Sequence, residues 1–222
     1  GGSRATQAPG AAPASRLVVV GTEDLKGKTS PCGCHIPRGG FARMAGFLDS
    51  TRAGDAAVLF VDAGGSFPEV DGRTDLAEFM LRSLVELHVD AVGVAPRDLR
   101  YGIAFLREQA ARHAAPMTCA NLADRATHTP VFPTSRIVET RGVRVGVFAL
   151  ISDRMDLGPA QDSLAVLDPE NTATREVAAL KAQGAQVVVL LSQLGRVGGE
   201  DIASAVPGID VLILGHDIPL RE

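Results

Sequence analysis

Long apolar runs and clusters of basic residues are both missing from this sequence of 222 residues. No apolar stretch approaches the roughly 18 residues of a membrane-spanning helix, so no membrane span is predicted. The chain has 22 lysines and arginines against 26 aspartates and glutamates, a net charge of -4, and no segment gathers the basic residues together. This distribution excludes nucleic acid as a partner. The hydrophobic content of 45% is enough for one well-buried domain, and there is no internal repeat.

Cysteine is scarce, with three residues that cannot all pair within one chain. In an exported protein an odd number leaves a thiol free, bound to a metal or bonded to another molecule. Residues 1–15 are mainly Gly, Ala, Pro and Ser and predict a flexible tether, followed by one domain over residues 16–222. Such a lead is common in envelope-anchored proteins, which favours an extracytoplasmic location in the periplasm or cell envelope. The remains of an expression tag explain the opening GGS equally well.

Apolar periodicity predicts an alternation of strands and helices along the domain. Alternating strands and helices are typical of an α/β fold with a mostly parallel sheet covered by helices on both faces. Two short apolar segments joined by a turn at Arg141-Gly142 predict a β-hairpin, which is an antiparallel departure. The predicted strands are 17–20, 57–61, 91–94, 116–119, 187–191 and 211–214, the helices 41–52, 76–87, 103–113, 172–183 and 199–206, and the hairpin 137–139 with 143–150.

Polar residues follow the predicted strands by a few positions. Because the carboxyl ends of parallel strands meet at one edge of a sheet, these residues are expected to lie together there. This arrangement is typical of an active site. The residues concerned are Asp24, Asp62, Pro96, Arg97, Asn121, Gln193 and His216.

Several short motifs occur at these strand exits and in a fixed order. They are TEDLKG at 22–27, GGFAR at 39–43, VDAGG at 61–65, APRDLRYG at 95–102, ANL at 120–122, LSQLG at 191–195 and GHDI at 215–218. In this order they resemble the motifs of the calcineurin-like metallophosphoesterases, and within them the N-terminal catalytic domain of the 5′-nucleotidases. The resemblance covers nearly the whole chain after the tether and implies the metallophosphoesterase-like fold.

The resemblance also implies a site for two divalent metals, bridged by one aspartate. Asp24 and Asp62 stand at the positions of a first-metal ligand and of the bridging aspartate, and His216 at that of a second-metal ligand. Gln193 and Asn121 stand at further positions of the same site and are expected to be its remnants.

Half of the implied ligands are replaced in this sequence. Lys26 and Ile218 stand where the first metal would have histidines, and Pro96 and Gln193 where the second would have Asn and His. Arg97 occupies the place of the histidine that protonates the leaving group. Proline and isoleucine have no ligand atom, and lysine and arginine bring positive charge to a place where a cation should bind. We therefore expect the two-metal centre to be lost.

Two buried carboxylates still need compensating positive charge, because an unpaired buried charge costs several kcal/mol. The sequence offers Lys26 and Arg97 for this purpose, and we expect Asp24 and Asp62 to be held by one of them in ion pairs.

The loop after the first predicted strand contains a second set of metal-ligating residue types. Cys32, Cys34 and His35 provide two thiolates and an imidazole within four residues, which is enough for three ligands to one soft or borderline metal such as zinc or copper. The same thiols favour redox exchange as a second interpretation, and a local disulfide or inert thiols as a third. Cys119 is either a fourth ligand, a resolving thiol or a small buried hydrophobe.

Two hypotheses follow for function. The first is a degenerate 5′-nucleotidase-like domain without two-metal hydrolysis that binds a metal or exchanges thiols through the loop. The alternative is an active phosphoesterase with a remodelled single-metal site built from Asp24, Asp62, His216 and loop thiols. Because the sequence ends soon after the last motif, the protein is expected to be either a natural short form or a fragment of a longer one. A fragment would favour a partner domain or chain at that edge of the sheet.

Overall fold

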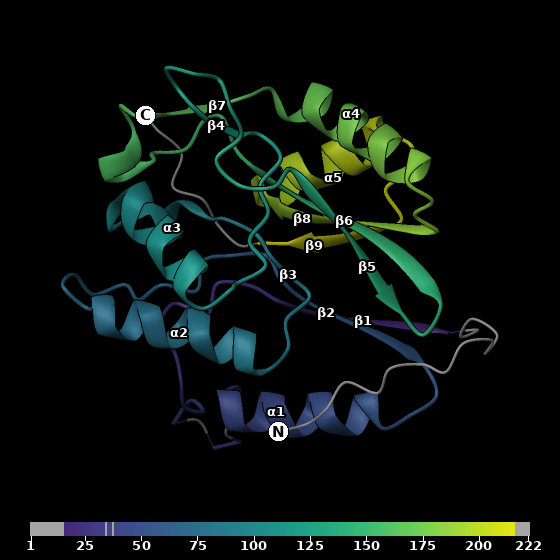
Figure 1. Cartoon of the computed structure of the whole chain (residues 1–222). Coiled ribbons are helices and arrows are strands. Elements are labelled where there is room, and N and C mark those ends of the chain that lie inside the picture. The colour runs from purple at the N-terminus through teal and green to yellow at the C-terminus, as the bar shows by residue number, and fades with distance from the viewer. Residues whose placement is uncertain (1–15, 34, 37, 216–222) are drawn as a thin grey trace.

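The computed structural model describes residues 16–33, 35–36 and 38–215 (Figure 1). The predicted tether and the predicted site residues Cys34, His216 and Ile218 lie outside these residues.

The first sheet has three parallel strands in the order β1-β2-β3. They are β1 (Leu17–Thr22), β2 (Ala57–Asp62) and β3 (Ala91–Val92). The central strand β2 is a continuous apolar run up to Asp62 and is buried along its whole length, as expected for a strand covered on both faces. Helix α1 (Phe41–Arg52), helix α2 (Thr74–Glu86) and helix α3 (Gly102–Arg112) connect and follow these strands.

The second sheet has four strands in the order β5-β6-β8-β9. Strands β5 (Ser135–Thr140) and β6 (Val143–Ile151) form the predicted antiparallel hairpin, and Arg141 and Gly142 at its turn both have positive φ, as a tight hairpin turn requires. Strands β8 (Val187–Gln193) and β9 (Val211–Leu214) run parallel to β6. Helices α4 (Pro169–Ala182) and α5 (Gly195–Ala205) accompany this sheet.

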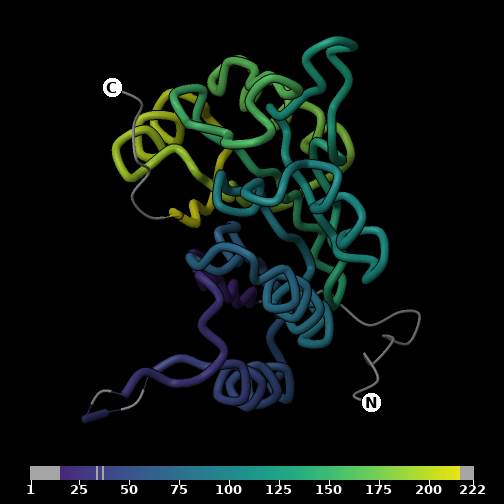
Figure 2. Tube along the Cα trace, turned by 90° about the vertical axis from the view of Figure 1, so that its left-hand side faces the viewer, coloured from purple at the N-terminus to yellow at the C-terminus, as the bar shows by residue number. Residues whose placement is uncertain are grey.

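The two sheets stack face to face, with helices on both outer faces (Figures 1 and 2). The layer between the sheets consists mainly of Ala and Val with two leucines, whereas the phenylalanine and methionine side chains of the core lie in the two layers under the helices. The inner layer includes Leu59, Val61, Val145, Val147, Val189 and Leu191; Phe60 packs with residues of α1, α2 and α3, and Phe148 with residues of α4 and α5. The predicted α/β class, parallel strands, helical layers and hairpin are confirmed, but the strands divide between two sheets.

Two local predictions were wrong. The segment 116–119 is not a strand. Only Met117 forms a β-bridge, to Val92, and the backbone N–H of Cys119 bonds the carbonyl of Pro133 and does not continue the pairing. A small antiparallel sheet of β4 (Leu122–Asp124) and β7 (Leu164–Val166) is formed by two segments for which the sequence predicted no strand. Strands of three residues are too short to show a periodicity in the sequence.

None of the helices in the described part of the chain combines the length and the apolar character that a bilayer crossing requires.

Candidate functional site

The ends of β2 and β8 meet, although the two strands belong to different sheets. The side-chain amide of Gln193, at the end of β8, donates a 3.0 Å hydrogen bond to the carbonyl of Ala63, directly after β2. The backbone N–H of Ser152, after β6, bonds the carbonyl of Gln193. Strand exits from both sheets therefore form one edge, as the sequence predicted.

Asp62 is the central acidic group of this edge and is fully buried. One carboxylate oxygen accepts a 2.7 Å hydrogen bond from the hydroxyl of Thr22, and the other accepts bonds from the N–H of Gly64 (2.9 Å) and the hydroxyl of Ser66 (3.3 Å). Burial raises the pKa of Asp62 to about 7, against these three hydrogen bonds, which lower it. The nearby charge of Asp98 raises this pKa further.

Asp98 is a second buried carboxylate, which the sequence analysis did not single out. It lies in the short 3-10 helix Pro96–Leu99 and accepts three backbone hydrogen bonds, from Gly65 (2.8 Å), Ala95 (2.9 Å) and Phe67 (3.3 Å). Burial raises the pKa of Asp98, and the charge of Asp24 adds to this shift. The available signal was its position in the APRDLRYG segment, directly after Pro96 and Arg97 at a predicted strand exit.

Asp24 lies against the same turn. Its backbone N–H bonds the carbonyl of Gly64, and a Cβ added at Gly65 would come within 2.1 Å of the Asp24 carboxylate. With a φ of +80°, Gly65 is also in a conformation that other residues rarely adopt. The structure thus brings Asp24, Asp62 and Asp98 together around Gly64 and Gly65.

The expected ion pairs between Asp62 and the basic residues are not formed among the described residues. Arg97 pairs instead with Glu69, at 3.6 Å, and its side chain is 29% exposed. Lys26 is fixed in the same turn through its backbone N–H, which bonds the carbonyl of Gly65. The prediction fails at Asp62 because three neutral donors already bond the carboxylate and burial favours its protonated form.

The side-chain amides of Gln193 and Asn121 donate hydrogen bonds to backbone carbonyls of neighbouring segments. The amide of Gln193 bonds Ala63, as described above, and its side chain fills the space next to Gly215, where a Cβ would come within 2.2 Å of it. The amide of Asn121 donates to the carbonyls of Ile151 and Leu167, and its oxygen accepts the N–H of Ile151. Both amides therefore hold backbone segments together.

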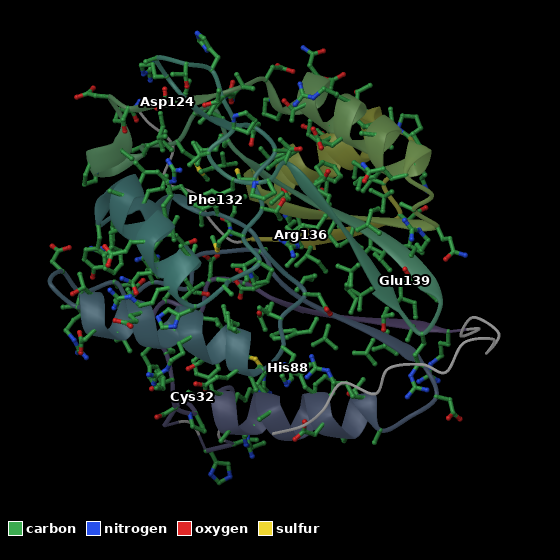
Figure 3. All side chains as sticks on the ribbon, viewed as in Figure 1. Cys32, His88, Asp124, Phe132, Arg136 and Glu139 are labelled. Atoms are coloured by element: carbon green, nitrogen blue, oxygen red, sulfur yellow. The ribbon has the colours of Figure 1, made fainter. Side chains whose placement is uncertain are left out.

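Cys32 and His35 are exposed. The backbone N–H of Cys32 bonds the carbonyl of Arg38 at 2.9 Å, and the N–H of Arg38 donates to the Cys32 sulfur at 3.3 Å, so these two residues close the loop at its base. Figure 3 places Cys32 beside α1 at the foot of the molecule, and Figure 2 shows the same segment extending away from the sheets. Cys32 therefore stands apart from the ends of β1 and β2.

Cys119 is not placed as a fourth ligand. Its side chain is fully buried in the apolar core with Met117, and its thiol lies 3.9 Å from the side-chain oxygen of Asn121. Burial raises the pKa of Cys119 to about 12. Its burial fits the third of the interpretations given above, a small buried hydrophobe.

Among the residues that the structure describes, those at the implied ligand positions do not fit a two-metal centre. Pro96 and the paired Arg97 provide no ligand atom, the Gln193 amide is bonded to Ala63, and the Asp62 oxygens accept bonds from the protein. In the part of the chain that the structure describes, no group of three or more His, Cys, Asp or Glu side chains is arranged to hold a metal ion.

No family model and no curated protein matches the sequence. Solved structures do match: the 5′-nucleotidase precursor of Thermus thermophilus is 24% identical with a TM-score of 0.76, over 91% of this chain and 43% of that one. The NAD nucleotidase of Haemophilus influenzae is 18% identical with a TM-score of 0.76, over 90% and 38%. The calcineurin-like phosphoesterase YfkN of Bacillus subtilis is 19% identical with a TM-score of 0.72, over 89% and 71%.

These similarities show that the chain has the calcineurin-like phosphoesterase fold, in the form found in 5′-nucleotidases, which confirms the fold expected from the motifs. The chain spans less than half the length of the two nucleotidases, at 43% and 38%.

Proposed function

We propose that this chain is a degenerate 5′-nucleotidase-like domain, without two-metal hydrolysis, that acts through the Cys32-Cys34-His35 loop. The loop would bind one soft or borderline divalent metal, such as zinc or copper, or exchange thiols. Its sequence carries the ligand types that such metals prefer.

The observation that carries the first half of this proposal is the environment of Asp62. A carboxylate that bridges two cations must be ionised and must direct its lone pairs at them. Asp62 instead accepts hydrogen bonds on both carboxylate oxygens, from Thr22 on one and from Gly64 and Ser66 on the other. These features support a structural role for this aspartate.

The second half is supported by the surroundings of Cys32. The Arg38 N–H donates to the Cys32 sulfur, and such a bond favours the thiolate, which is the form that binds metals and attacks disulfides. The exposure of Cys32 and His35 leaves both accessible. The contribution of Cys34 rests on its position in the sequence.

A partner chain or domain at β9 and an extracytoplasmic location belong to the same proposal. Strand β9 is an edge strand of apolar residues, all of them partly exposed, and an edge of this kind is a ready template for another strand.

Two measurements test the proposal on purified protein. The first is hydrolysis of p-nitrophenyl phosphate and AMP with manganese, zinc or cobalt added, using Asp62→Ala as the comparison. We expect no hydrolysis that depends on Asp62. Turnover that this substitution abolishes, or two tightly bound ions per chain, would overturn the loss of the hydrolytic site.

The second measurement is zinc and copper binding by elemental analysis after dialysis, together with a titration of accessible thiols. We expect one bound ion, or a reactive dithiol, that is lost in Cys32→Ser and Cys34→Ser and kept in Cys119→Ser. Equal behaviour of all these variants would rule out the loop as the site.

A further inference from the structure

The segment 25–48, which carries the cysteine loop, has a charge opposite to that of the whole chain. It contains four basic residues, Lys26, Lys28, Arg38 and Arg43, and no aspartate or glutamate, whereas the chain has a net charge of -4. Figure 2 shows the loop before α1 extending away from the sheets. An exposed segment with charges of one sign attracts ligands of the opposite sign.

Arg38 lies directly across the loop from Cys32. The backbone N–H of Cys32 bonds the carbonyl of Arg38 at 2.9 Å, and the N–H of Arg38 donates to the Cys32 sulfur at 3.3 Å. Nearer to α1, the N–H of Phe41 bonds the carbonyl of Thr29 at 3.1 Å, so the two arms of the loop run side by side. Both contacts of Arg38 with Cys32 use its backbone, and its guanidinium takes part in neither.

Lys28 adds a second cation to the same loop. It directly precedes Thr29, and its backbone N–H bonds the carbonyl of Leu25 at 2.8 Å. Lys28 and Arg38 are both exposed. Within residues 16–33, 35–36 and 38–215, neither of these two side chains forms an ion pair. Their charges are therefore available to a ligand that approaches Cys32.

We propose that the loop exchanges thiols with anionic disulfides, in which carboxylates lie close to the S–S bond. This inference rests on the thiol exchange of the proposed function and names its substrate class. Arg38 binds a carboxylate, because a guanidinium matches that group in shape and charge, and Lys28 adds to the attraction.

The exchange needs no oxidant besides the substrate. The Cys32 thiol gives up its proton to water, and the thiolate attacks one sulfur of the substrate disulfide. A bond forms between this sulfur and the Cys32 sulfur while the S–S bond of the substrate breaks. The other half leaves as a thiolate and takes up a proton from water. Cys32 is thereby oxidised to a mixed disulfide, and the substrate is reduced by the same two electrons.

The test compares three small disulfides of similar size with charges of -2, 0 and +2, which are 3,3′-dithiodipropionate, 2-hydroxyethyl disulfide and cystamine. Their reaction with Cys32 is followed by intact mass in the Cys34→Ser chain, where no neighbouring loop thiol resolves the mixed disulfide. Each rate is divided by that of 2-mercaptoethanol with the same probe, because the leaving thiols differ in pKa.

We expect the normalised rate to be at least about fivefold higher for dithiodipropionate than for the neutral probe, and lower for cystamine. One pair of opposite unit charges about 7 Å apart in water changes a rate by a factor of about three, and the loop offers two cations. Raising the ionic strength from about 0.02 M to about 0.5 M shortens the screening length from about 20 Å to about 4 Å, so the preference should fall below about twofold.

Substitutions assign the preference to the two cations. Lys28→Gln and Arg38→Gln should each lower the preference for dithiodipropionate over the neutral probe by about threefold. Both leave the backbone bonds of the loop in place. Arg38→Lys keeps the charge and should keep most of the preference. Arg107→Gln is the matched control and should not change it, because Arg107 is an exposed cation on α3.

The outcomes separate this inference from the proposed function. Equal normalised rates for the three probes, or a preference that survives both Lys28→Gln and Arg38→Gln, would overturn the anionic substrate and leave thiol exchange in place. The same applies if Arg107→Gln lowers the preference as much as they do. Failure of Cys32 to react with any of the three disulfides would overturn thiol exchange itself, and this inference with it.

Discussion

Thr22 and Asp62 are register partners at the ends of the paired strands β1 and β2, and the Thr22 hydroxyl donates a 2.7 Å hydrogen bond to the Asp62 carboxylate. The bond joins the two loops that carry the acidic cluster. Asp62 is thereby tied to β1 by Thr22 and to its own turn by Gly64 and Ser66. The site is thus organised around the backbone and hydroxyl partners of Asp62.

The raised pKa of Asp62 predicts that the protein loses stability as the pH rises from about 4 to about 7. In this range the unfolded carboxyl, with a pKa of 3.8, is ionised while the folded one, with a pKa of about 7, still holds its proton. The folded state binds more protons, so the free energy of unfolding falls with increasing pH, by roughly 4 kcal/mol in total. Urea unfolding at a series of pH values measures this slope.

The Asp62→Asn variant should flatten this slope. Asparagine has the same shape, and its amide can donate to the Thr22 hydroxyl while its oxygen accepts from Gly64. Part of the slope should remain, because the pKa of Asp98 is also raised by burial. Exposed Asp49→Asn is the control and should leave the slope unchanged. An unchanged slope in Asp62→Asn would contradict the shifted pKa.

Asp98→Asn should destabilise the fold by about 2–4 kcal/mol. The carboxylate accepts three backbone N–H bonds, whereas an asparagine amide has one oxygen and would turn its NH₂ group toward a backbone donor. Thermal and urea unfolding at pH 7 test this expectation. Stability equal to that of the wild type would show that Asp98 does not hold Gly65, Ala95 and Phe67 together.

The arrangement of the elements could be predicted from the sequence where a local pattern determines it. The apolar run before Asp62 predicts β2, and the turn at Arg141-Gly142 predicts the β5 and β6 hairpin. The division into two sheets could not be predicted in this way. Strands such as β2 and β8 are apolar on both faces, so their periodicity does not indicate which sheet they join or what covers them.

The sequence allowed only some of the residues of the acidic cluster to be predicted. Asp62 ends β2 and Asp24 comes two residues after β1, and their meeting follows from the parallel pairing of these strands. The partner of Arg97 was not predictable, because Glu69 and Asp62 are both carboxylates and the choice depends on side-chain direction and burial. Asp98 was missed because its partners are backbone N–H groups, which a sequence does not distinguish from any others.

Thiol reactivity should separate Cys32 from Cys119. Cys32 is exposed, whereas Cys119 is fully buried and its pKa is raised to about 12. We expect iodoacetamide to label Cys32 in the native protein at pH 8 and to label Cys119 only after unfolding in denaturant. Peptide mapping by mass spectrometry measures both sites, and the unfolded protein is the control. Labelling of native Cys119 at a comparable rate would contradict its placement in the core.

Arg97 and Arg100 stand three positions apart and should respond differently to truncation. Arg97 forms a 3.6 Å pair with Glu69, which is 56% exposed, and such surface pairs contribute about 0–1 kcal/mol. Arg100 is 22% exposed in its side chain and bonds the carbonyl of Pro68 and the carboxylate of Asp71. We therefore expect Arg97→Ala to cost less than about 1 kcal/mol and Arg100→Ala about 1–3 kcal/mol in urea unfolding.

The Arg97→Ala variant also tests whether Arg97 neutralises Asp62. If it did, its removal would leave a buried carboxylate uncompensated, cost about 3–5 kcal/mol and steepen the loss of stability toward pH 7. Because Asp62 is bonded by neutral donors, the pH dependence of Arg97→Ala should match that of the wild type. Glu69→Gln is the matched control, since it removes only the observed partner of Arg97 and should cost as little as Arg97→Ala. A large loss of stability in Arg97→Ala, without a similar loss in Glu69→Gln, would contradict this and support an ion pair between Arg97 and the acidic cluster.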